Sequence, residues 1–384
     1  MRIVHIANFY GPNSGGIKTT LHELGKGYQS QGHEFIYIVP GTGRYEETTI
    51  FGRKITVPGI FLPGSGGYQV IRSNRDLKKL LAELDPDRLE VSDRFTLISV
   101  GKWARDRAIP SIAFSHETLF GLAYKYLPTF LPRKLIVDWH NRRFARNFDS
   151  IVTTTDFAAQ EFTELSLRNI RKVPLGVDLE NFSPTLRNEK LRSELLRGSK
   201  YLIVHCGRLS PEKDPLLSIY GLAELRKRGI DARLIVIGIG PMWQKFRMAA
   251  KGLPVDTLGY IADRKKVAAI LASADVTIAP GPLETFCLAA LESLASGTPV
   301  VASKHSAVGE FLLLKEETPA GAVAVNDPDA FADEIERLLG RNEHRWAARR
   351  AAEKLPWHFC VERMLQLHQI PLRAEVRSLS EKAA

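Results

Sequence analysis

Short apolar runs alternate with helix-length stretches along most of the chain, and this alternation restricts the fold more than any other feature. Helices are expected at Gly16–Gln31, Arg72–Leu84 and Asp214–Arg228. Strands that are apolar along their whole length are typical of parallel sheets covered by helices on both faces. The fold class is therefore α/β and doubly wound. The expected strands are Arg2–Ala7, Glu34–Val39, Ser111–Ser115, Ile151–Thr154, Tyr201–His205, Arg233–Gly238, Asp275–Ala279 and Pro299–Ala302.

The alternating pattern occurs twice, and a Pro- and Gly-containing connection after residue 172 separates the two series. A length of 384 residues also fits two domains. We expect an N-terminal Rossmann-like domain at 1–173, a C-terminal one at 174–355, and a final helix with a frayed tail at 356–384. Doubly wound sheets bind ligands beyond the carboxyl ends of their strands. Two such halves predict a deep cleft between them.

The chain has 53 Lys and Arg against 43 Asp and Glu, a formal charge of +10. This excess suggests an anionic partner, which could be nucleic acid, a membrane surface or a phosphorylated substrate. Basic proteins without such a partner are also common. Cys206, Cys287 and Cys360 form no CxxC pair, which argues against a disulfide framework or zinc site and fits a cytosolic protein. No apolar run approaches the roughly 20 residues that span a bilayer, and the N-terminus lacks a signal-peptide core.

The first candidate motif is the glycine-containing segment Gly11–Thr20, which follows a strand and opens a helix. Backbone N–H groups at such a turn can hold a phosphate. The segment is close to a P-loop, but Ile17 separates Gly16 from Lys18 and turns the lysine to another side of the helix. A turn that lines the cleft is favoured, and a plain tight turn is the alternative.

The second motif, Gly207–Lys213, follows the first strand of the second half. Arg208 and Lys213 flank a turn that contains proline, so both cations could reach one anion such as a diphosphate. Two basic residues in a loop are more often simply solvated, and this reading stays open.

The third motif carries two carboxylates, Glu284 and Glu292. We expect a helix from near Thr285 to Ser296, which would separate the carboxylates by roughly 12 Å at 1.5 Å per residue. That distance is about the span from the sugar to the ribose of a nucleotide-sugar. Surface glutamates on an ordinary helix are the alternative. The N–H groups at the helix start, on Phe286, Cys287 and Leu288, could face the diphosphate.

A fourth candidate is His116, which comes directly after the expected strand Ser111–Ser115. A histidine at the end of a strand in a cleft-forming fold could orient a hydroxyl or carbonyl group. A single histidine is more often structural, so the sequence leaves both readings open.

The last candidate is a basic stretch between residues 133 and 146 that also holds Trp139 and Phe144. Its positive charges scatter around the helix at 100° per residue rather than gathering on one face, as an interfacial helix requires. Membrane docking and a packed helix with basic ends are therefore comparable readings.

The spacing of Glu284 and Glu292 resembles the E-x7-E motif of retaining GT-B glycosyltransferases of family 4. The residues around the opening of the chain, His5–Gly16, are most similar to actinobacterial GDP-mannose-dependent mannosyltransferases that act on phosphatidylinositol or related lipids. Cys287 departs from the family pattern, where glycine is common. Further matches, in the family's order, are Gly15–Gly16, Val173–Asp178 with Phe182, Gly207–Lys213, Val236–Pro241 and Ser296–Ala302.

The resemblance implies a role for each motif. Arg208 and Lys213 would neutralise the leaving diphosphate in place of a metal ion, and His116 would lie near the reacting sugar carbon. Glu284 would bind the sugar hydroxyls and Glu292 the ribose. Other donor-binding residues would be Gly15, Gly16, Tyr260, Ile261, Thr285, Phe286, Cys287 and Leu288, and the acceptor would meet Tyr10, Asn13, Lys18 and the loops near Arg72 and Arg94.

The implied activity is transfer of a hexose to a hydroxyl of a lipid-linked or glycolipid acceptor, with retention of configuration. The favoured hexose is mannose, and the favoured donor is GDP-mannose. No cofactor or metal is expected, and the location would be cytoplasmic, on or near an anionic membrane surface. UDP-glucose or another nucleotide-sugar with a soluble acceptor is the alternative. A nucleic-acid-binding protein is a distant alternative because no aromatic residues interleave with the basic ones in a known motif. A P-loop phosphohydrolase would require hydrolysis of ATP that depends on Lys18.

Overall fold

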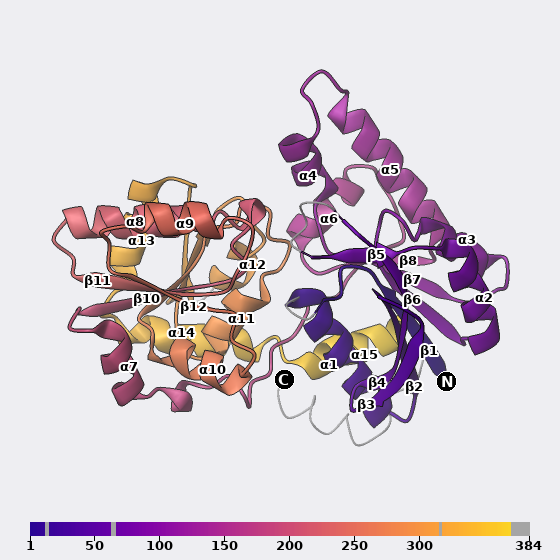
Figure 1. Cartoon of the computed structure of the whole chain (residues 1–384), viewed down its shortest axis with the longest axis horizontal. Helices are drawn as coiled ribbons and strands as arrows, with labels where there is room; N and C mark the ends of the chain where they lie inside the picture. Colours follow the sequence, from indigo (N-terminus) through magenta and orange to yellow (C-terminus); the bar gives the residue numbers. More distant parts are fainter. Residues whose placement is uncertain (12–14, 63–66, 315–316, 370–384) are drawn as a thin grey trace. The chain divides into compact units, whose positions relative to one another are not determined.

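The computed structural model describes residues 1–11, 15–62, 67–314 and 317–369. Contacts divide the chain into two compact units (Figure 1). Unit 1 contains Met1–Leu175 and the segment that begins at Trp357, and unit 2 contains Gly176–Pro356. Each unit is built on a largely parallel sheet, so the predicted α/β class is confirmed.

Unit 1 has a nine-stranded sheet in the order β3-β4-β2-β1-β6-β7-β8-β9, with β5 paired to β4. β3 and β5 run antiparallel to β4, whereas β1 is parallel to both of its neighbours. The strands are β1 Arg2–Ala7, β2 Glu34–Gly41, β3 Tyr45–Thr49, β4 Gly52–Phe61, β5 Gln69–Ile71, β6 Arg88–Ser92, β7 Ser111–Ser115, β8 Ser150–Thr153 and β9 Ile170–Lys172.

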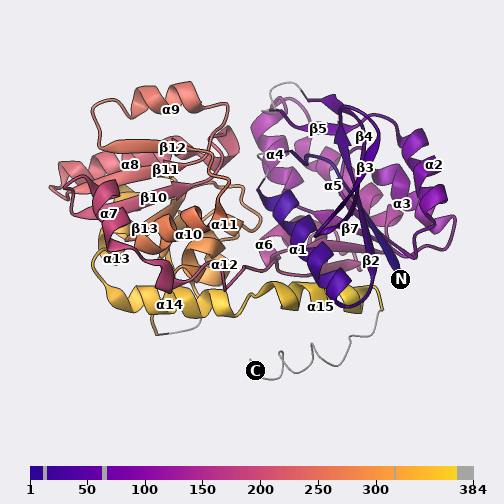
Figure 2. The ribbon, with the colours of Figure 1, turned by 60° about the horizontal axis from the view of Figure 1, so that its bottom comes forward.

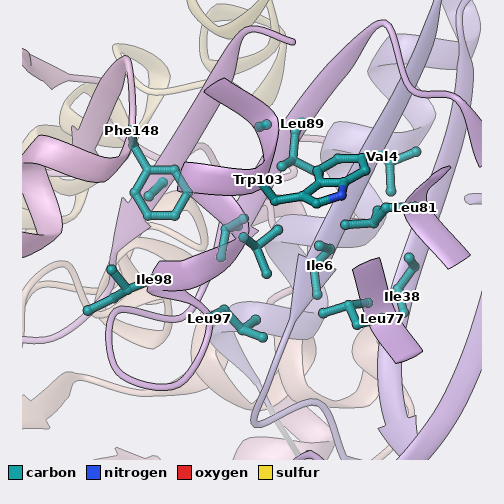
Figure 3. Close-up of a cluster of buried hydrophobic side chains, with 14 of the residues drawn as sticks. Val4, Ile6, Ile38, Leu77, Leu81, Leu89, Leu97, Ile98, Trp103 and Phe148 are labelled. Atoms are coloured by element: carbon teal, nitrogen blue, oxygen red, sulfur yellow. The ribbon is translucent and has the colours of Figure 1, made fainter. Parts of the chain in front are cut away.

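The helices of unit 1 bury their apolar sides against this sheet. Figure 3 shows part of the resulting core, in which Leu77 and Leu81 of α2 and Trp103 of α3 lie beside strand residues such as Ile6. α2 begins where the Ser73 hydroxyl accepts a hydrogen bond from the Asp76 N–H, a typical N-cap. The helices are α1 Gly16–Ser30, α2 Asn74–Leu84, α3 Ile98–Arg105, α4 Leu119–Tyr126, α5 Arg133–Asn147, α6 Asp156–Thr163 and α15 Trp357–Leu367.

The last helix, α15, packs against α1 although more than 300 residues separate them in the sequence (Figure 2). The approach is close because Gly27 of α1 has no side chain. A Cβ built on Gly27 would lie 2.3 Å from Cγ2 of Val361. α15 is therefore an integral part of unit 1.

Unit 2 has a six-stranded parallel sheet in the order β12-β11-β10-β13-β14-β15. In chain order this is the 3-2-1-4-5-6 arrangement of the Rossmann fold. Its strands are β10 Tyr201–Cys206, β11 Ala232–Ile237, β12 Val255–Gly259, β13 Val276–Ala279, β14 Val300–Ser303 and β15 Gly321–Ala324. Its α-helices are α7 Glu189–Leu196, α8 Pro215–Lys227, α9 Trp243–Ala249, α10 Arg264–Ser273, α11 Leu288–Ala295, α12 Gly309–Leu312, α13 Pro328–Leu338 and α14 Asn342–Glu353.

All eight predicted strands exist, and each boundary lies within two residues of its expected position. Several further strands were not predicted, among them β3, β4 and β6. Among the described residues, no helix combines the length and apolar character needed to cross a bilayer.

Candidate active site

In unit 2 the candidate site forms where β10 ends and the chain turns through Gly207–Lys213. Two glycines of the neighbouring loop permit this turn to pack closely. A Cβ on Gly238 would lie 1.9 Å from the Gly207 carbonyl oxygen, and one on Gly240 would lie 2.3 Å from the Leu209 carbonyl oxygen. Residues Pro211–Lys213 form a 3-10 turn that fixes the backbone from which the lysine extends.

A second loop, which follows β13, places Glu284 against this turn. Gly281 allows the contact, because a Cβ there would lie 3.2 Å from Cα of Lys213. The Glu284 carboxylate accepts a hydrogen bond from the Lys213 ammonium group. The Glu284 carbonyl oxygen also accepts a 2.8 Å hydrogen bond from the Ala307 N–H, which fixes the loop. The structure thus brings together two predicted site residues that are 71 positions apart.

The Lys213–Glu284 pair lies in a partly desolvated place. Burial opposes the charge of Lys213, but the neighbouring Glu284 carboxylate outweighs it and raises the pKa of the lysine above its ordinary value. Glu284 itself is nearly buried, with 10% of its side chain exposed. Lys213 therefore stays a cation at neutral pH, and its role in neutralising a phosphate stays a prediction.

Glu292 has a partner of its own, Arg264, at the start of α10. The Arg264 guanidinium donates a hydrogen bond to the Glu292 carboxylate and lies 4.8 Å from the ring centre of Phe182. Burial raises the pKa of Glu292, although the charge of Arg264 partly counteracts it. Arg264 was not among the predicted site residues. Its position four residues after Tyr260, which was expected near the base, was the available signal.

The helix predicted to start near Thr285 begins at Leu288 instead, so that prediction is wrong. Cys287, directly before α11, has φ of 69° and ψ of 77°, a left-handed conformation that favours glycine. This conformation interrupts the helix between the two glutamates, and the estimate of roughly 12 Å, which assumed a continuous helix, does not apply. It also explains physically why glycine suits position 287.

Two thiols lie within the same charged cluster. Burial, and then the charge of Glu292, raise the pKa of Cys206 to about 12. Burial and the charge of Glu284 likewise raise the pKa of Cys287. Both thiols are therefore protonated at neutral pH and are not poised as nucleophiles.

The remaining predicted donor residues lie around this cluster in different environments. Phe286 is buried against Phe311, with ring centres 5.6 Å apart, so only its backbone can face a ligand. Thr285 is also nearly buried, whereas Tyr260 is exposed. Arg208 and Ile261 are half-buried. Convergence of Arg208 and Lys213 on one anion stays a prediction.

In unit 1, His116 lies directly after β7. Its Nε2 is 2.8 Å from the Ser92 hydroxyl, and its ring stacks on Phe114 with 5.6 Å between ring centres. Burial, and then the positive charge of His5, lower the pKa of His116 to about 3. His116 is therefore neutral at physiological pH, with one protonated ring nitrogen and one lone pair.

Gly15 and Gly16 stand at the start of α1. No described atom lies within 4 Å of a Cβ built on either residue, so packing does not require these glycines. Tyr10 lies in a cluster of rings, with its hydroxyl 3.1 Å from His22 Nε2, and the Lys18 ammonium lies 6.0 Å from the Tyr10 ring centre. Asn13, the third predicted acceptor residue, lies outside the described residues.

The expectation that the loop at Arg94 contacts the acceptor does not fit the guanidinium of that residue. Arg94 is fully buried and donates hydrogen bonds to the Glu161 carboxylate at 2.6 Å and to Ser115 at 3.0 Å. Its guanidinium also lies 5.1 Å from the ring centre of Phe162. Arg94 therefore holds β7 and two helices together rather than facing solvent.

No group of three or more His, Cys, Asp or Glu side chains within the described ranges is arranged to hold a metal ion.

Comparison with protein families gives two adjacent matches. Residues 14–181 match the model described as Glycosyltransferase Family 4, and residues 187–355 match the model described as Glycosyl transferases group 1. The boundary between the matches lies close to the boundary between the two units.

Among curated proteins, the chain is similar to a GDP-mannose-dependent alpha-(1-6)-phosphatidylinositol dimannoside mannosyltransferase of Mycobacterium tuberculosis. The two are 44% identical over 368 residues, and the matched region covers 95% of each chain. The chain is 26% identical to a GDP-mannose-dependent alpha-mannosyltransferase of Corynebacterium glutamicum, over 87% of this chain and 82% of that protein. Among solved structures, sucrose-phosphate synthase from Thermosynechococcus elongatus matches with a TM-score of 0.76 at 18% identity, covering 96% of this chain and 98% of that one.

Proposed function

The chain belongs to family 4 of the glycosyltransferases and has their GT-B fold, as its motifs predict, and we propose that it transfers mannose from GDP-mannose to a phosphatidylinositol-based mannolipid. The observation that carries this proposal is the 44% identity, over 95% of both chains, to an enzyme named for that donor and that class of acceptor. The match spans 95% of the chain and therefore includes residues of both units.

The residues of unit 2 bind the nucleotide-sugar in this proposal. Lys213 and Arg208 neutralise the diphosphate, and the Glu284 carboxylate accepts hydrogen bonds from sugar hydroxyls. Glu292, held by Arg264, accepts from the ribose hydroxyls. Each glutamate is paired with a cation, which orients both carboxylates before the donor arrives. The backbone at Gly259–Ile261 meets the base.

The reaction replaces one bond at the anomeric carbon and keeps its configuration. The bond from that carbon to the β-phosphate oxygen breaks, and a bond to the acceptor oxygen forms on the same face. The acceptor hydroxyl gives its proton to the departing phosphate oxygen, so GDP and the extended glycolipid are the products. Stabilising the charge that develops on the diphosphate is the main task of Lys213 and Arg208.

Unit 1 supplies His116 near the reacting carbon, and Gly15 and Gly16 near the diphosphate. No described atom lies within 4 Å of a Cβ built on either glycine, which is consistent with a ligand that approaches the backbone closely. Tyr10 and Lys18 then contact the acceptor, where a lysine suits the phosphate of a phosphoinositol headgroup.

A donor panel tests this proposal. The purified chain is incubated with a membrane-lipid extract and GDP-mannose, GDP-glucose or UDP-glucose, and the lipids are examined by mass spectrometry. We expect one added hexose per lipid with GDP-mannose. Transfer from UDP-glucose alone would overturn the donor assignment.

A Glu284→Gln variant tests the site. It keeps the size of the side chain but removes the charge that pairs with Lys213, so transfer should be lost while the circular dichroism spectrum is unchanged. Glu194→Gln, on the exposed side of α7, is the matched control and should keep full turnover. Undiminished turnover in Glu284→Gln would exclude this glutamate from the reaction.

We further propose that unit 1 docks on an anionic membrane surface through α4, α5 and the loop between them, which projects from the sheet (Figure 1). Large exposed apolar side chains gather here, and Phe130 is the most exposed of them at 83%. Such a set of aromatic and basic side chains is typical of interfacial binding. The apolar members are Phe120, Tyr124, Tyr126, Phe130, Leu135, Ile136 and Trp139, and the exposed basic ones are Lys125, Lys134, Arg142, Arg143 and Arg146.

Not every residue of the predicted basic stretch belongs to this surface. Phe144 is fully buried, and His140 Nε2 lies 2.8 Å from the Arg94 carbonyl oxygen, so both face inward. The membrane in this proposal is the cytoplasmic face, which would also hold the lipid acceptor.

Vesicle sedimentation tests the docking. The protein should sediment with phosphatidylcholine vesicles that contain phosphatidylinositol, more strongly than with phosphatidylcholine alone. A Phe130→Ser/Trp139→Ser variant should lose this binding, whereas Trp346→Ser, which changes an equally exposed tryptophan of unit 2, should keep it. Equal binding by all three proteins would exclude this surface.

A further inference from the structure

The guanidinium of Arg94 holds the loop that carries His116. This loop, residues 116–118, connects β7 to α4 and is called the His116 loop below. Arg94 Nη1 donates to the Ser115 hydroxyl at 3.0 Å and to the Glu117 carbonyl oxygen at 2.8 Å, so one nitrogen binds the residues on both sides of the histidine. The Ser115 hydroxyl also donates to the Glu117 carbonyl oxygen, at 3.3 Å. The chain is therefore fixed directly before and directly after His116.

The Glu161 carboxylate of α6 fixes the far end of the His116 loop, where α4 begins. One of its oxygens accepts from Arg94 Nη1 at 2.6 Å and from the Leu119 N–H at 3.4 Å. The other oxygen accepts from the Phe120 N–H at 3.0 Å. Leu119 and Phe120 are the first two residues of α4, and N–H groups at such positions have no partner within their helix. Glu161 thus ties the start of α4 to Arg94.

The Arg94–Glu161 pair is buried, and several elements hold it. The side chain of Arg94 is 0% exposed and that of Glu161 is 8% exposed. Arg94 Nη2 donates to the Asn141 side chain of α5, and the guanidinium lies 5.1 Å from the ring centre of Phe162 on α6. The Arg94 carbonyl oxygen accepts from His140 Nε2, also on α5, at 2.8 Å. The planar fork of the arginine therefore reaches β7, α5 and α6 from one position, which the single ammonium group of a lysine cannot do.

Stability alone does not account for this buried pair. Removing two charges from water costs free energy that offsets much of their attraction, so a buried ion pair contributes little net stability. The hydrogen bonds of the pair instead fix geometry, and they end on the residues just before and just after His116. We propose that Arg94 and Glu161 are positioning residues that hold the His116 loop where His116 meets the reacting sugar. This inference rests on the proposed function, in which His116 lies near the reacting carbon.

Arg94→Lys in the full-length protein tests the positioning role. The lysine keeps a positive charge beside Glu161, so the variant should fold, but one ammonium group cannot bind Ser115, Glu117 and Asn141 together. We expect kcat for mannosyl transfer to fall on the order of tenfold to a hundredfold, the effect of moving a group at the reacting centre by about 1 Å. The KM for GDP-mannose should change little, because the charged donor-binding residues of unit 2 are unaltered.

Hydrogen exchange measured by mass spectrometry on the peptide that contains residues 116–122 reports the state of the loop without any substrate. Protection should fall about tenfold or more in Arg94→Lys and in Glu161→Gln, because each loses a charged hydrogen-bond partner. The single amide oxygen of Glu161→Gln cannot occupy both carboxylate oxygen positions, which bind Arg94 and the start of α4. Arg44→Lys, which changes an arginine of unit 1 that is 54% exposed, is the matched control and should keep full protection and full kcat.

Leu84→Ala separates positioning from a loss of stability. Leu84 is buried at the end of α2, and its carbonyl oxygen accepts from Arg2 at the start of β1. It therefore lies at the amino edge of the parallel strands, whereas His116 lies at their carboxyl edge. Leu84→Ala should lower the melting temperature and leave the kcat of the folded enzyme unchanged. If Leu84→Ala and Arg94→Lys lose kcat equally for an equal loss of melting temperature, the pair is only structural and the proposal is overturned.

Arg94→Lys is the deciding variant, because Glu161→Gln leaves a buried cation without its counter-charge and could fail to fold. A folded Arg94→Lys variant with unchanged loop protection, or with unchanged kcat, would overturn the proposal. Failure of the proposed function has a different signature. In that case the unaltered chain transfers no mannose from GDP-mannose, whereas failure of this inference leaves the turnover of the unaltered chain intact.

Discussion

Replacing Gly27 with alanine tests how α15 is held on unit 1. The added Cβ would lie 2.3 Å, 2.6 Å and 3.0 Å from Cγ2, Cγ1 and Cβ of Val361, all below a normal contact. Both helices carry buried residues on either side of this point, so neither can shift without disturbing its neighbours. The substitution therefore forces the two helices apart.

The expected magnitude follows from two opposing effects. Overpacking costs about 1–3 kcal/mol, and alanine gains about 1 kcal/mol over glycine inside a helix, which leaves a net loss of about 0–2 kcal/mol. Val361→Ala removes two buried methyl groups, at about 0.8 kcal/mol each, or about 1.6 kcal/mol. In the double variant the alanine at 27 fills the space that the valine leaves, so its loss should be smaller than the sum of the single losses by about 1–3 kcal/mol.

Hydrogen exchange measured by mass spectrometry on the peptide that contains α15 gives this coupling directly in the full-length chain. A change of 1.4 kcal/mol in local opening alters protection about tenfold. Val361→Ala should lower protection by about fifteenfold and Gly27→Ala by up to about thirtyfold, and the double variant should recover most of it. Gly43→Ala is the matched control, because no described atom lies within 4 Å of its Cβ position. Purely additive losses would refute the close packing of α15 on α1.

Three further predictions concern the candidate site and its surroundings. Gly16→Ala should leave the melting temperature unchanged, since its Cβ meets no described atom, and should lower kcat/KM for the donor; a large loss of stability would contradict this. Burial, and then the charge of Lys213, lower the pKa of His205 to about 4, so its contribution to stability is present above about pH 6.5 and is lost as the pH falls toward 4. The free energy of unfolding should fall by about 2 kcal/mol between pH 6.5 and 5 because of this group. The melting temperature of His205→Gln should therefore fall less steeply over that pH range than the melting temperature of the unaltered chain. The thiol of Cys206, with its pKa at about 12, should resist iodoacetamide at pH 8 until the protein is unfolded, and rapid labelling of the native protein, detected by peptide mass spectrometry, would contradict this raised pKa.

The central strands could be predicted from the sequence because their composition leaves little choice. β1 and β7 have the expected bounds, since each is a short, mostly apolar run that is buried along nearly its whole length. β3 could not be found this way, because Tyr45–Thr49 is polar and exposed. It is stabilised by pairing with β4, where Arg53 and Lys54 bind Glu46 and Glu47 across the strands.

In the candidate site, too, some features could be predicted from the sequence and others could not. The two glutamates and the loop cations could be found from motif spacing, and Lys213 does meet Glu284. The partner of Glu292 could not be predicted, because Arg264 belongs to another helix and only tertiary folding brings the two residues together. The left-handed backbone conformation of Cys287 could not be predicted, because the neighbouring residues have a pattern typical of a continuous helix.

Mannosyl transfer from GDP-mannose with retention of configuration is the central claim, and the anomeric configuration of the product tests it most directly. The full-length chain is supplied with GDP-mannose labelled with ¹³C in the sugar and with a phosphatidylinositol-based mannolipid, and the product lipid is examined by NMR. The account predicts a single new labelled α-mannosyl residue, formed by the unaltered chain and by Glu194→Gln but not by Glu284→Gln. A β-linked product, or no transfer of the label by the unaltered chain, would contradict it.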